Sequence, residues 1–222
     1  MTGSNHFMFR AAATIAALFA LAPALLSAPA QAGQQVEERL APSVVAGLQR
    51  AIADSPVPGD YVKSAGVRAW LDEMSKRLAP KVPDGQSRDE FMATVHYESA
   101  RAGLDPQLVL GVIYHESGLK KYAFSIVGAR GYMQVMPFWV KQIGTPDQNL
   151  FNLRTNLRYG TVILRHYLDI ENGDYYRALG RYNGSLGQAE YPNAVLAALN
   201  RHFAYTPAAP AAIISVAVPA SR

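Results

Sequence analysis

One carboxylic acid, Glu116, stands at a position where a helix would bury it and then end. It follows Val112 by four residues and Ile113 by three, so the three side chains share one helix face. Asp105-Pro106 is a typical helix start, and Gly118 is a typical helix end. Burial and the negative end of a helix dipole both disfavour a charged carboxylate, so both raise its pKa. A carboxyl group that holds its proton near neutral pH can protonate a leaving oxygen, as glycoside cleavage requires. The same spacing also fits a glutamate that merely turns outward to water.

The elements that must position this acid are predicted to be helices, so the fold class is mainly α. Apolar periodicity predicts an amphipathic helix over residues 61–79. The next helix is predicted to begin near Ser87, with Glu90 as its capping-box partner, and to stop at Gly103. Residues 34–54 have a weaker helical pattern that Pro42 interrupts. From residue 105 to residue 203, helices are expected to alternate with short glycine-bearing turns.

Four ordered blocks of sequence resemble the soluble lytic transglycosylase (SLT-type) family of domains. They are the HESGL run at 115–119, Ser125 with GARGYMQVMP at 128–137, NLRYG at 156–160, and RYNG at 181–184. The resemblance covers about residues 87–203. It implies a lysozyme-like, two-lobed helical domain with a substrate groove between the lobes.

The resemblance also implies an activity, which is cleavage of the MurNAc-GlcNAc β-1,4 bond of peptidoglycan without water. Glu116 would protonate the glycosidic oxygen. It would then act as the base while the MurNAc 6-hydroxyl attacks C1, which leaves a 1,6-anhydroMurNAc end. Because the attacking hydroxyl belongs to the substrate, proximity would replace an enzyme nucleophile.

Six further residues in these blocks are expected to bind substrate or support the acid. Ser125 could bond the carboxylate or a sugar, or could cap a turn. Gly131 permits backbone conformations closed to other residues, and the Gln134 amide could bind sugar hydroxyls. The remaining three are Met136, which could pack on a sugar or in the core, Tyr182, whose hydroxyl could reach Glu116, and Asn183, which is expected to brace its turn.

The sequence departs from the family pattern at several positions. Tyr132 replaces the usual Leu, and Lys120, Lys121 and Tyr122 stand where the family often has Asn-Pro. The segment from Tyr182 reads YNGSLG in place of YNAG and leads to Tyr191-Pro192, which resembles the family's Tyr-Pro at the start of its final helix.

Two other functions stay open at this point. A hydrolytic muramidase would need a second carboxylate, at about 5–5.5 Å from the first in a retaining enzyme or about 6.5–9.5 Å in an inverting one. The candidates are Asp147, Asp174 and Glu190. A non-catalytic peptidoglycan-binding module is the third possibility, and it would not need Glu116.

Composition excludes several classes of function. There is no cysteine, so disulfides and thiolate metal sites are absent, and the five histidines form no zinc motif. The net charge of +4 comes from scattered Lys and Arg residues, unlike the concentrated basic stripe of a nucleic-acid binder. We therefore expect no metal, no cofactor and no nucleic acid, with peptidoglycan glycan strands as the partner.

The ends of the chain differ in composition from its middle. Residues 11–26 form an apolar run, and Ala30-Gln31-Ala32 is a signal-peptidase pattern. We predict a signal peptide at 1–32, an N-terminal helical extension at 33–86, the catalytic domain at 87–203 and a flexible C-terminal tail at 204–222. The product would be a periplasmic monomer without membrane contact after cleavage, and its partners in wall or secretion machinery stay unnamed.

Overall fold

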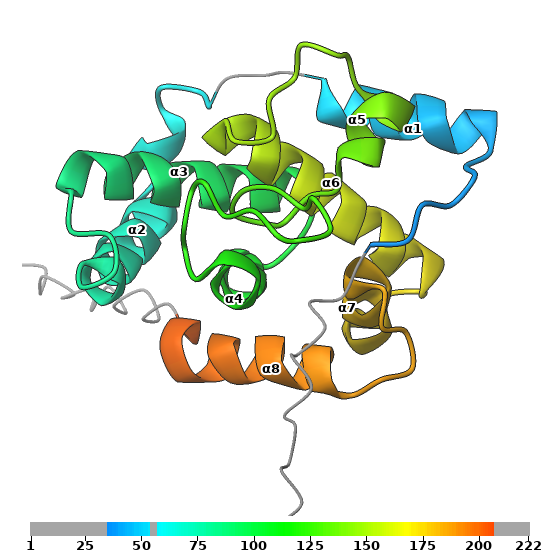
Figure 1. Ribbon diagram of the computed structural model, residues 1–222. Coiled ribbons are helices and arrows are strands. Elements are labelled where there is room, and N and C mark those ends of the chain that lie inside the picture. The colour runs from blue at the N-terminus through cyan, green and yellow to red at the C-terminus, as the bar shows by residue number, and fades with distance from the viewer. Residues whose placement is uncertain (1–34, 54–56, 207–222) are drawn as a thin grey trace, which may run out of the picture. The chain divides into compact units, whose positions relative to one another are not determined.

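The computed structural model describes residues 35–53 and 57–206, and these residues form helices joined by loops (Figure 1). The predicted signal peptide and most of the predicted tail lie outside the described residues. The helices are α1 (Pro42–Ile52), η1 (Tyr61–Lys63), α2 (Ala65–Leu78), α3 (Gly85–Arg101), α4 (Pro106–Ser117), α5 (Pro137–Ile143), α6 (Leu153–Ile170), α7 (Tyr175–Asn183), α8 (Glu190–Ala198) and η2 (Leu199–Phe203). The prediction of a mainly α protein is confirmed. No helix in the described ranges has the length and apolarity needed to cross a bilayer.

Helix α4 lies inside the bundle, between α3 and α8 (Figure 1). Its side chains from Leu108 to Ile113 are buried in an unbroken run. Gly111 lets α8 approach closely, because a Cβ at this position would lie 3.0 Å from the Val195 carbonyl oxygen. The helix begins and ends as predicted, with the Asp105 side chain accepting from Gln107 N and with Gly118 in the left-handed conformation at φ 59°.

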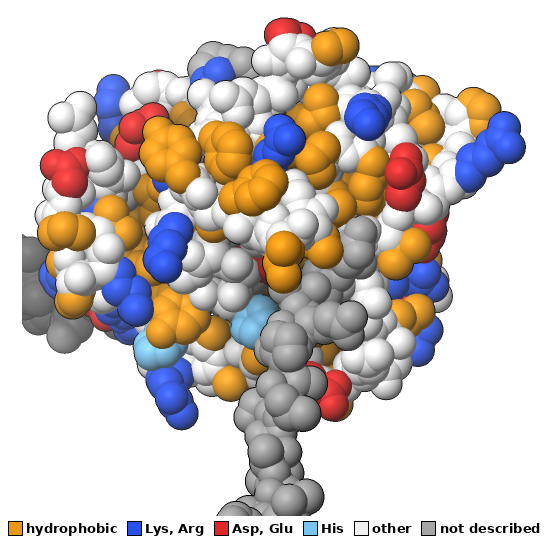
Figure 2. All heavy atoms as spheres, viewed as in Figure 1, with side chains coloured by type: hydrophobic (Ala, Val, Ile, Leu, Met, Phe, Trp, Pro, Cys, Tyr) orange, Lys and Arg blue, Asp and Glu red, His pale blue; other side chains and the backbone are white. Residues whose placement is uncertain are grey.

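A long loop, residues 118–136, follows α4 and lies above the end of α4 in the view of Figure 1. Isolated β-bridges pair Arg130 with Phe124 and Val135. Hydrophobic side chains gather on the face shown in Figure 2. Three of the loop's apolar side chains are strongly exposed, namely Tyr122 at 72%, Phe124 at 64% and Ile126 at 105%. Exposed apolar side chains clustered in this way are typical of a contact surface.

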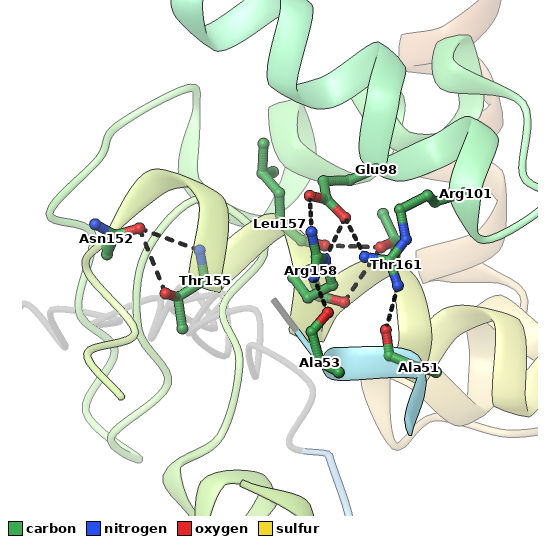
Figure 3. Close-up of polar contacts among 9 residues, drawn as sticks. All are labelled: Ala51, Ala53, Glu98, Arg101, Asn152, Thr155, Leu157, Arg158 and Thr161. Atoms are coloured by element: carbon green, nitrogen blue, oxygen red, sulfur yellow. Dashed lines mark hydrogen bonds and ion pairs between the residues drawn. The ribbon is translucent and has the colours of Figure 1, made fainter. Parts of the chain in front are cut away.

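The carboxyl end of the N-terminal helix α1 is bound by two arginines from other helices, Arg101 on α3 and Arg158 on α6 (Figure 3). Arg101 donates to the Ala51 carbonyl oxygen at 2.6 Å, and Arg158 donates to the Ala53 carbonyl oxygen at 2.5 Å. Arg158 also forms a two-pronged ion pair with Glu98, at 2.5 and 2.6 Å, and both side chains are buried. Cations at this end of a helix satisfy its free carbonyl groups and its dipole. Helix α1 therefore packs on α5 and α6 as part of the same bundle.

The predicted cap of α3 and the predicted interruption at Pro42 were both wrong. Ser87 does not cap α3, because the helix begins two residues earlier and the Asp84 side chain accepts from Ser87 N at 2.7 Å. Aspartate is as good an N-cap as serine, and with Asp84 as the cap the helix also includes Gly85 and Gln86. Pro42 begins α1 and does not interrupt it, since a proline is tolerated in the first turn of a helix.

Candidate active site

Glu116 lies in the last turn of α4, where its side chain is partly buried. The Tyr191 hydroxyl, at the start of α8, donates a hydrogen bond to Glu116 Oε1 at 2.6 Å. Tyr191 is itself packed edge-on against the ring of His115 at 5.0 Å. The close approach of α8 to α4 thus brings one hydroxyl onto the carboxyl group and fixes its direction.

Burial raises the pKa of Glu116 to about 7, and the hydrogen bond from Tyr191 acts in the opposite sense. Burial is the main cause that raises the pKa values of Tyr191 and Tyr182, and the charge of Glu116 raises both further. Both phenols therefore stay neutral donors next to the carboxylate. A carboxyl group with this pKa is partly protonated at neutral pH, so it can give up a proton and take one back.

The turn that includes Gly131 cannot hold a larger residue. Gly131 has φ 74°, and a Cβ there would lie 2.4 Å from Asn156 Nδ2 and 2.6 Å from the Leu150 carbonyl oxygen. Gln134 also has a positive φ, 47°, and its amide nitrogen donates to the carbonyl oxygens of Gly131 at 2.9 Å and Ala123 at 3.2 Å. The Gln134 amide nitrogen is therefore engaged inside the loop.

Asn156, on α6, holds the same turn from the side opposite to solvent. Its Oδ1 accepts from Met133 N at 2.8 Å, while its Nδ2 donates to the carbonyl oxygens of Arg130 and Leu150, each at 2.8 Å. The side chain is fully buried. One amide group thus satisfies three backbone groups of the loop, which accounts for the order of a segment without regular secondary structure.

Ser125 forms a turn in this structure. Its Oγ accepts from Ala129 N at 3.0 Å, and its carbonyl oxygen accepts from Gly128 N at 3.0 Å. These are the bonds of a turn cap, which was one of its two predicted roles. A contact with substrate stays a prediction.

Tyr182 and Asn183 end α7 and are both buried. The Tyr182 hydroxyl donates to the Met133 carbonyl oxygen at 2.7 Å, so the tyrosine that donates to Glu116 in this structure is Tyr191. Tyr182 nevertheless lies near enough to Glu116 for their charges to interact. Met136 is also buried, at 7% exposure. The contribution of these three residues to catalysis stays a prediction.

The other carboxylates proposed as partners have different surroundings. Asp174 caps α7, because its side chain accepts from Arg177 N at 3.1 Å. Asp147 and Glu190 are exposed. Within the described residues, the groups that shift the pKa of Glu116 include no second carboxylate. In the same ranges no group of three His, Asp or Glu side chains could hold a metal ion.

Comparison with known proteins identifies the family of the domain that contains this site. Residues 93–195 match the model of the transglycosylase SLT domain. This part of the chain belongs to the SLT family. The SLT domain includes α4 with Glu116, the loop with Gly131 and Gln134, and Tyr191 at the start of α8.

Relatives of the SLT domain occur in a phage and in bacteria. The chain is 36% identical over 138 residues to a protein named transglycosylase from Enterobacteria phage PRD1, which covers 57% of this chain and 51% of that protein. It is 30% identical over 150 residues to membrane-bound lytic murein transglycosylase C of Glaesserella parasuis, covering 60% of this chain and 41% of the relative. The chain thus spans about half the length of these relatives or less. Lytic transglycosylase Slt from Pseudomonas aeruginosa, a solved structure, aligns with 19% identity and a TM-score of 0.41 over 76% of this chain and 35% of its own.

Three residues that organise the SLT domain were not singled out from the sequence. From the sequence, Tyr191 is predicted only as part of a helix start, through the resemblance of Tyr191-Pro192 to the family's Tyr-Pro. Asn156 lies in a matching block, but the sequence assigns it no role. The pattern that could have marked it is an amide side chain directly before a buried helical stripe. Gln35, which accepts from Met136 N at 3.2 Å, lies far from every matching block, and no sequence pattern marked it.

Proposed function

We propose that this chain is a lytic transglycosylase, which cleaves the β-1,4 bond between MurNAc and GlcNAc in peptidoglycan. The observation that carries the proposal is the state of Glu116. It is partly buried inside an SLT domain, it accepts a hydrogen bond from Tyr191, and burial raises its pKa to about 7. The relatives are named transglycosylases and lytic murein transglycosylases.

In the proposed reaction one carboxyl group handles both protons. Protonated Glu116 gives its proton to the glycosidic oxygen as the bond from that oxygen to C1 breaks. The carboxylate then accepts the proton of the MurNAc 6-hydroxyl as the new O6–C1 bond forms. The reaction consumes no water, and Glu116 ends in its starting protonation state. A pKa near the working pH serves both steps, because neither direction of transfer is then strongly uphill.

The surroundings of Glu116 favour transglycosylation over hydrolysis. A hydrolytic mechanism requires a second carboxylate at a fixed separation from the acid. Among the described residues, Asp174 is engaged in capping α7, and no carboxylate contributes to the pKa shift of Glu116. The neighbours of Glu116 are the neutral phenols of Tyr191 and Tyr182, which can hydrogen-bond but cannot activate water as a carboxylate would.

The loop after α4 is the proposed partner of the glycan strand. Its backbone is held by Asn156 and by the bonds of Gln134, so the loop is preorganised. Its exposed apolar side chains, Tyr122 and Phe124 among them, give a surface on which sugar rings could pack. Rigid support of this kind lowers the entropic cost of positioning a substrate.

The setting of the enzyme is part of the proposal. We infer export to the periplasm after removal of residues 1–32, and action on glycan strands as a monomer. The division into an extension at 33–86, a catalytic domain at 87–203 and a tail at 204–222 is proposed on sequence grounds. Wall and secretion partners stay unassigned.

The variant Glu116→Gln tests the chemistry and separates it from binding. The amide keeps the shape of the side chain and an acceptor for Tyr191, but it cannot transfer the proton. We expect loss of at least about a thousandfold in the release of soluble muropeptides from purified sacculi, with sacculus binding in a pelleting assay kept. Equal release by the variant and the wild type would overturn the proposal.

A further inference from the structure

A buried amide from outside the SLT domain reaches the candidate active site. Gln35 is 4% exposed, and its Oε1 accepts from Met136 N at 3.2 Å and from Trp139 Nε1 at 3.1 Å. Gln35 also interacts with Tyr182, and this interaction acts to lower the pKa of that phenol. A glutamine is costly to bury unless its polar atoms are bonded, and here the amide oxygen has two donors.

The partners of Gln35 belong to three elements, namely the loop after α4, α5 and α7. Met136 ends the loop after α4 and precedes the first residue of α5. Tyr182, on α7, donates to the Met133 carbonyl oxygen at 2.7 Å and interacts electrostatically with Glu116. Gln35 thus joins the end of the loop to the α7 tyrosine that interacts with Glu116.

The segment that delivers Gln35, residues 35–40, is here called the N-terminal strap. In Figure 1 it is the blue segment that leads into α1. The Gln142 amide donates to the Glu38 carbonyl oxygen at 3.0 Å, and Arg181 lies 3.9 Å from the Glu38 carboxylate. Leu40 packs against the core. The strap is therefore fixed to α5 and α7 at several points, so the position of Gln35 is determined by more than its own bonds.

We propose that Gln35 is a positioning residue of the active site, supplied by the N-terminal strap from outside the SLT domain. Its amide holds the Tyr182 hydroxyl on the Met133 carbonyl oxygen and holds the Met136 end of the loop. This arrangement keeps the Tyr182 phenol in place on the α7 side of Glu116. The inference rests on the proposed function.

The environment of Glu116 defines what a change at Gln35 should do. Tyr191 faces the acid from α8, Tyr182 faces it from α7, and His115 on α4 packs against Tyr191. Tyr167 interacts with Tyr182 in turn. Loss of the Gln35 amide frees Tyr182 to rotate, while a carboxylate in its place adds negative charge on this side of Glu116.

The test uses Gln35→Leu, which removes both polar ends, and Gln35→Glu, which keeps the size and adds charge. Val36→Ala, at a neighbouring strap residue that is 55% exposed, is the matched control. For each variant we would measure kcat and KM on a soluble glycan substrate, the folded fraction by circular dichroism, and the pKa of Glu116 by carboxyl-carbon NMR. We expect kcat to fall about tenfold in Gln35→Leu with KM within about twofold, since small misplacements of reacting groups act on the rate. In Gln35→Glu the added charge should raise the pKa of Glu116 by about half a unit or more.

The measurements distinguish failure of the proposed function from failure of the role proposed for Gln35. If the wild type releases no products, the proposed function fails, and the NMR measurement still decides the role of Gln35. A wild-type kcat in Gln35→Leu, or a loss of rate that matches the loss of folded protein, would overturn the proposal. An unchanged Glu116 pKa in Gln35→Glu would overturn it too, and this second variant decides the matter if Gln35→Leu does not fold.

Discussion

Among single residues, Glu116 decides the proposed chemistry through the way it holds its proton. Burial raises its pKa to about 7, and the hydrogen bond from Tyr191 limits that rise. The sequence predicted the acid and the direction of the shift, because the spacing from Val112 and Ile113 put it on a buried face. It did not predict Tyr191 as the donor, because a hydroxyl 75 residues away becomes a neighbour only when α8 crosses α4.

The variant Tyr191→Phe tests that hydrogen bond. The bond favours the charged form of Glu116, so its removal should raise the pKa of the acid above about 7. Activity that needs the protonated acid falls as the pH rises through this pKa, and that fall should therefore move to higher pH in the variant. We expect a lower kcat as well, by about tenfold, because the carboxyl group loses its orientation.

The measurement is a profile of kcat against pH for the wild type and Tyr191→Phe, with Tyr176→Phe as the control. Tyr176 also begins a helix, but its hydroxyl bonds to Asn193 at 3.2 Å on the surface. A profile of Tyr191→Phe that coincides with that of the wild type would show that this bond does not tune the acid.

At the scale of the element, the loop after α4 is ordered by side chains of α6 more than by its own pattern. Asn156 bonds three backbone groups of the loop. The helix start at Asp105-Pro106 and the helix end at Gly118 could be predicted because capping is local. The start of α3 could not, since Asp84 and Ser87 compete as caps and the choice depends on packing. The turn cap made by Ser125 is local and was one of its predicted roles. The bond from Gln134 to Ala123 spans 11 residues, and no local pattern encodes it.

The variant Asn156→Ala should weaken the loop and the fold together. It leaves Met133 N and the carbonyl oxygens of Arg130 and Leu150 buried without this partner, so we expect a loss of about 2–5 kcal/mol in the free energy of unfolding. Asn149→Ala is the matched control, because Asn149 is exposed and its Oδ1 accepts one bond, from Phe151 N at 2.9 Å. Urea unfolding of both variants measures the difference. Equal losses would mean that Asn156 is not the main support of the loop.

At the scale of the whole molecule, the segment before the SLT domain is built into the same bundle. Helix α1 is held through its last carbonyl groups by Arg101 and Arg158, and Arg158 pairs with buried Glu98. Composition and periodicity predicted the fold class but not this attachment. A single Glu and a single Arg 60 residues apart form no pattern, and their pairing follows from the packing of α3 against α6.

The variant Arg158→Leu tests this attachment. It leaves the Glu98 carboxylate buried without its main partner, which should cost about 3–5 kcal/mol of stability, and the double variant Glu98→Leu/Arg158→Leu should recover much of that loss. Arg165→Leu, on the same helix, removes a surface pair with Asp169 and should cost less than about 1 kcal/mol. Thermal and urea unfolding would compare the four proteins. A loss in Arg158→Leu no larger than that in Arg165→Leu would contradict a structural role for the buried pair.

The masses of the products show whether the sugar's own hydroxyl or water completes the cleavage. Purified sacculi are digested with the wild-type chain, and the released muropeptides are separated and weighed. We expect 1,6-anhydroMurNAc ends, each lighter by about one water than the product of hydrolysis, because the attack is intramolecular. Release of muropeptides with reducing MurNAc ends at the heavier mass would contradict it, and would place a water molecule where the 6-hydroxyl is proposed to react.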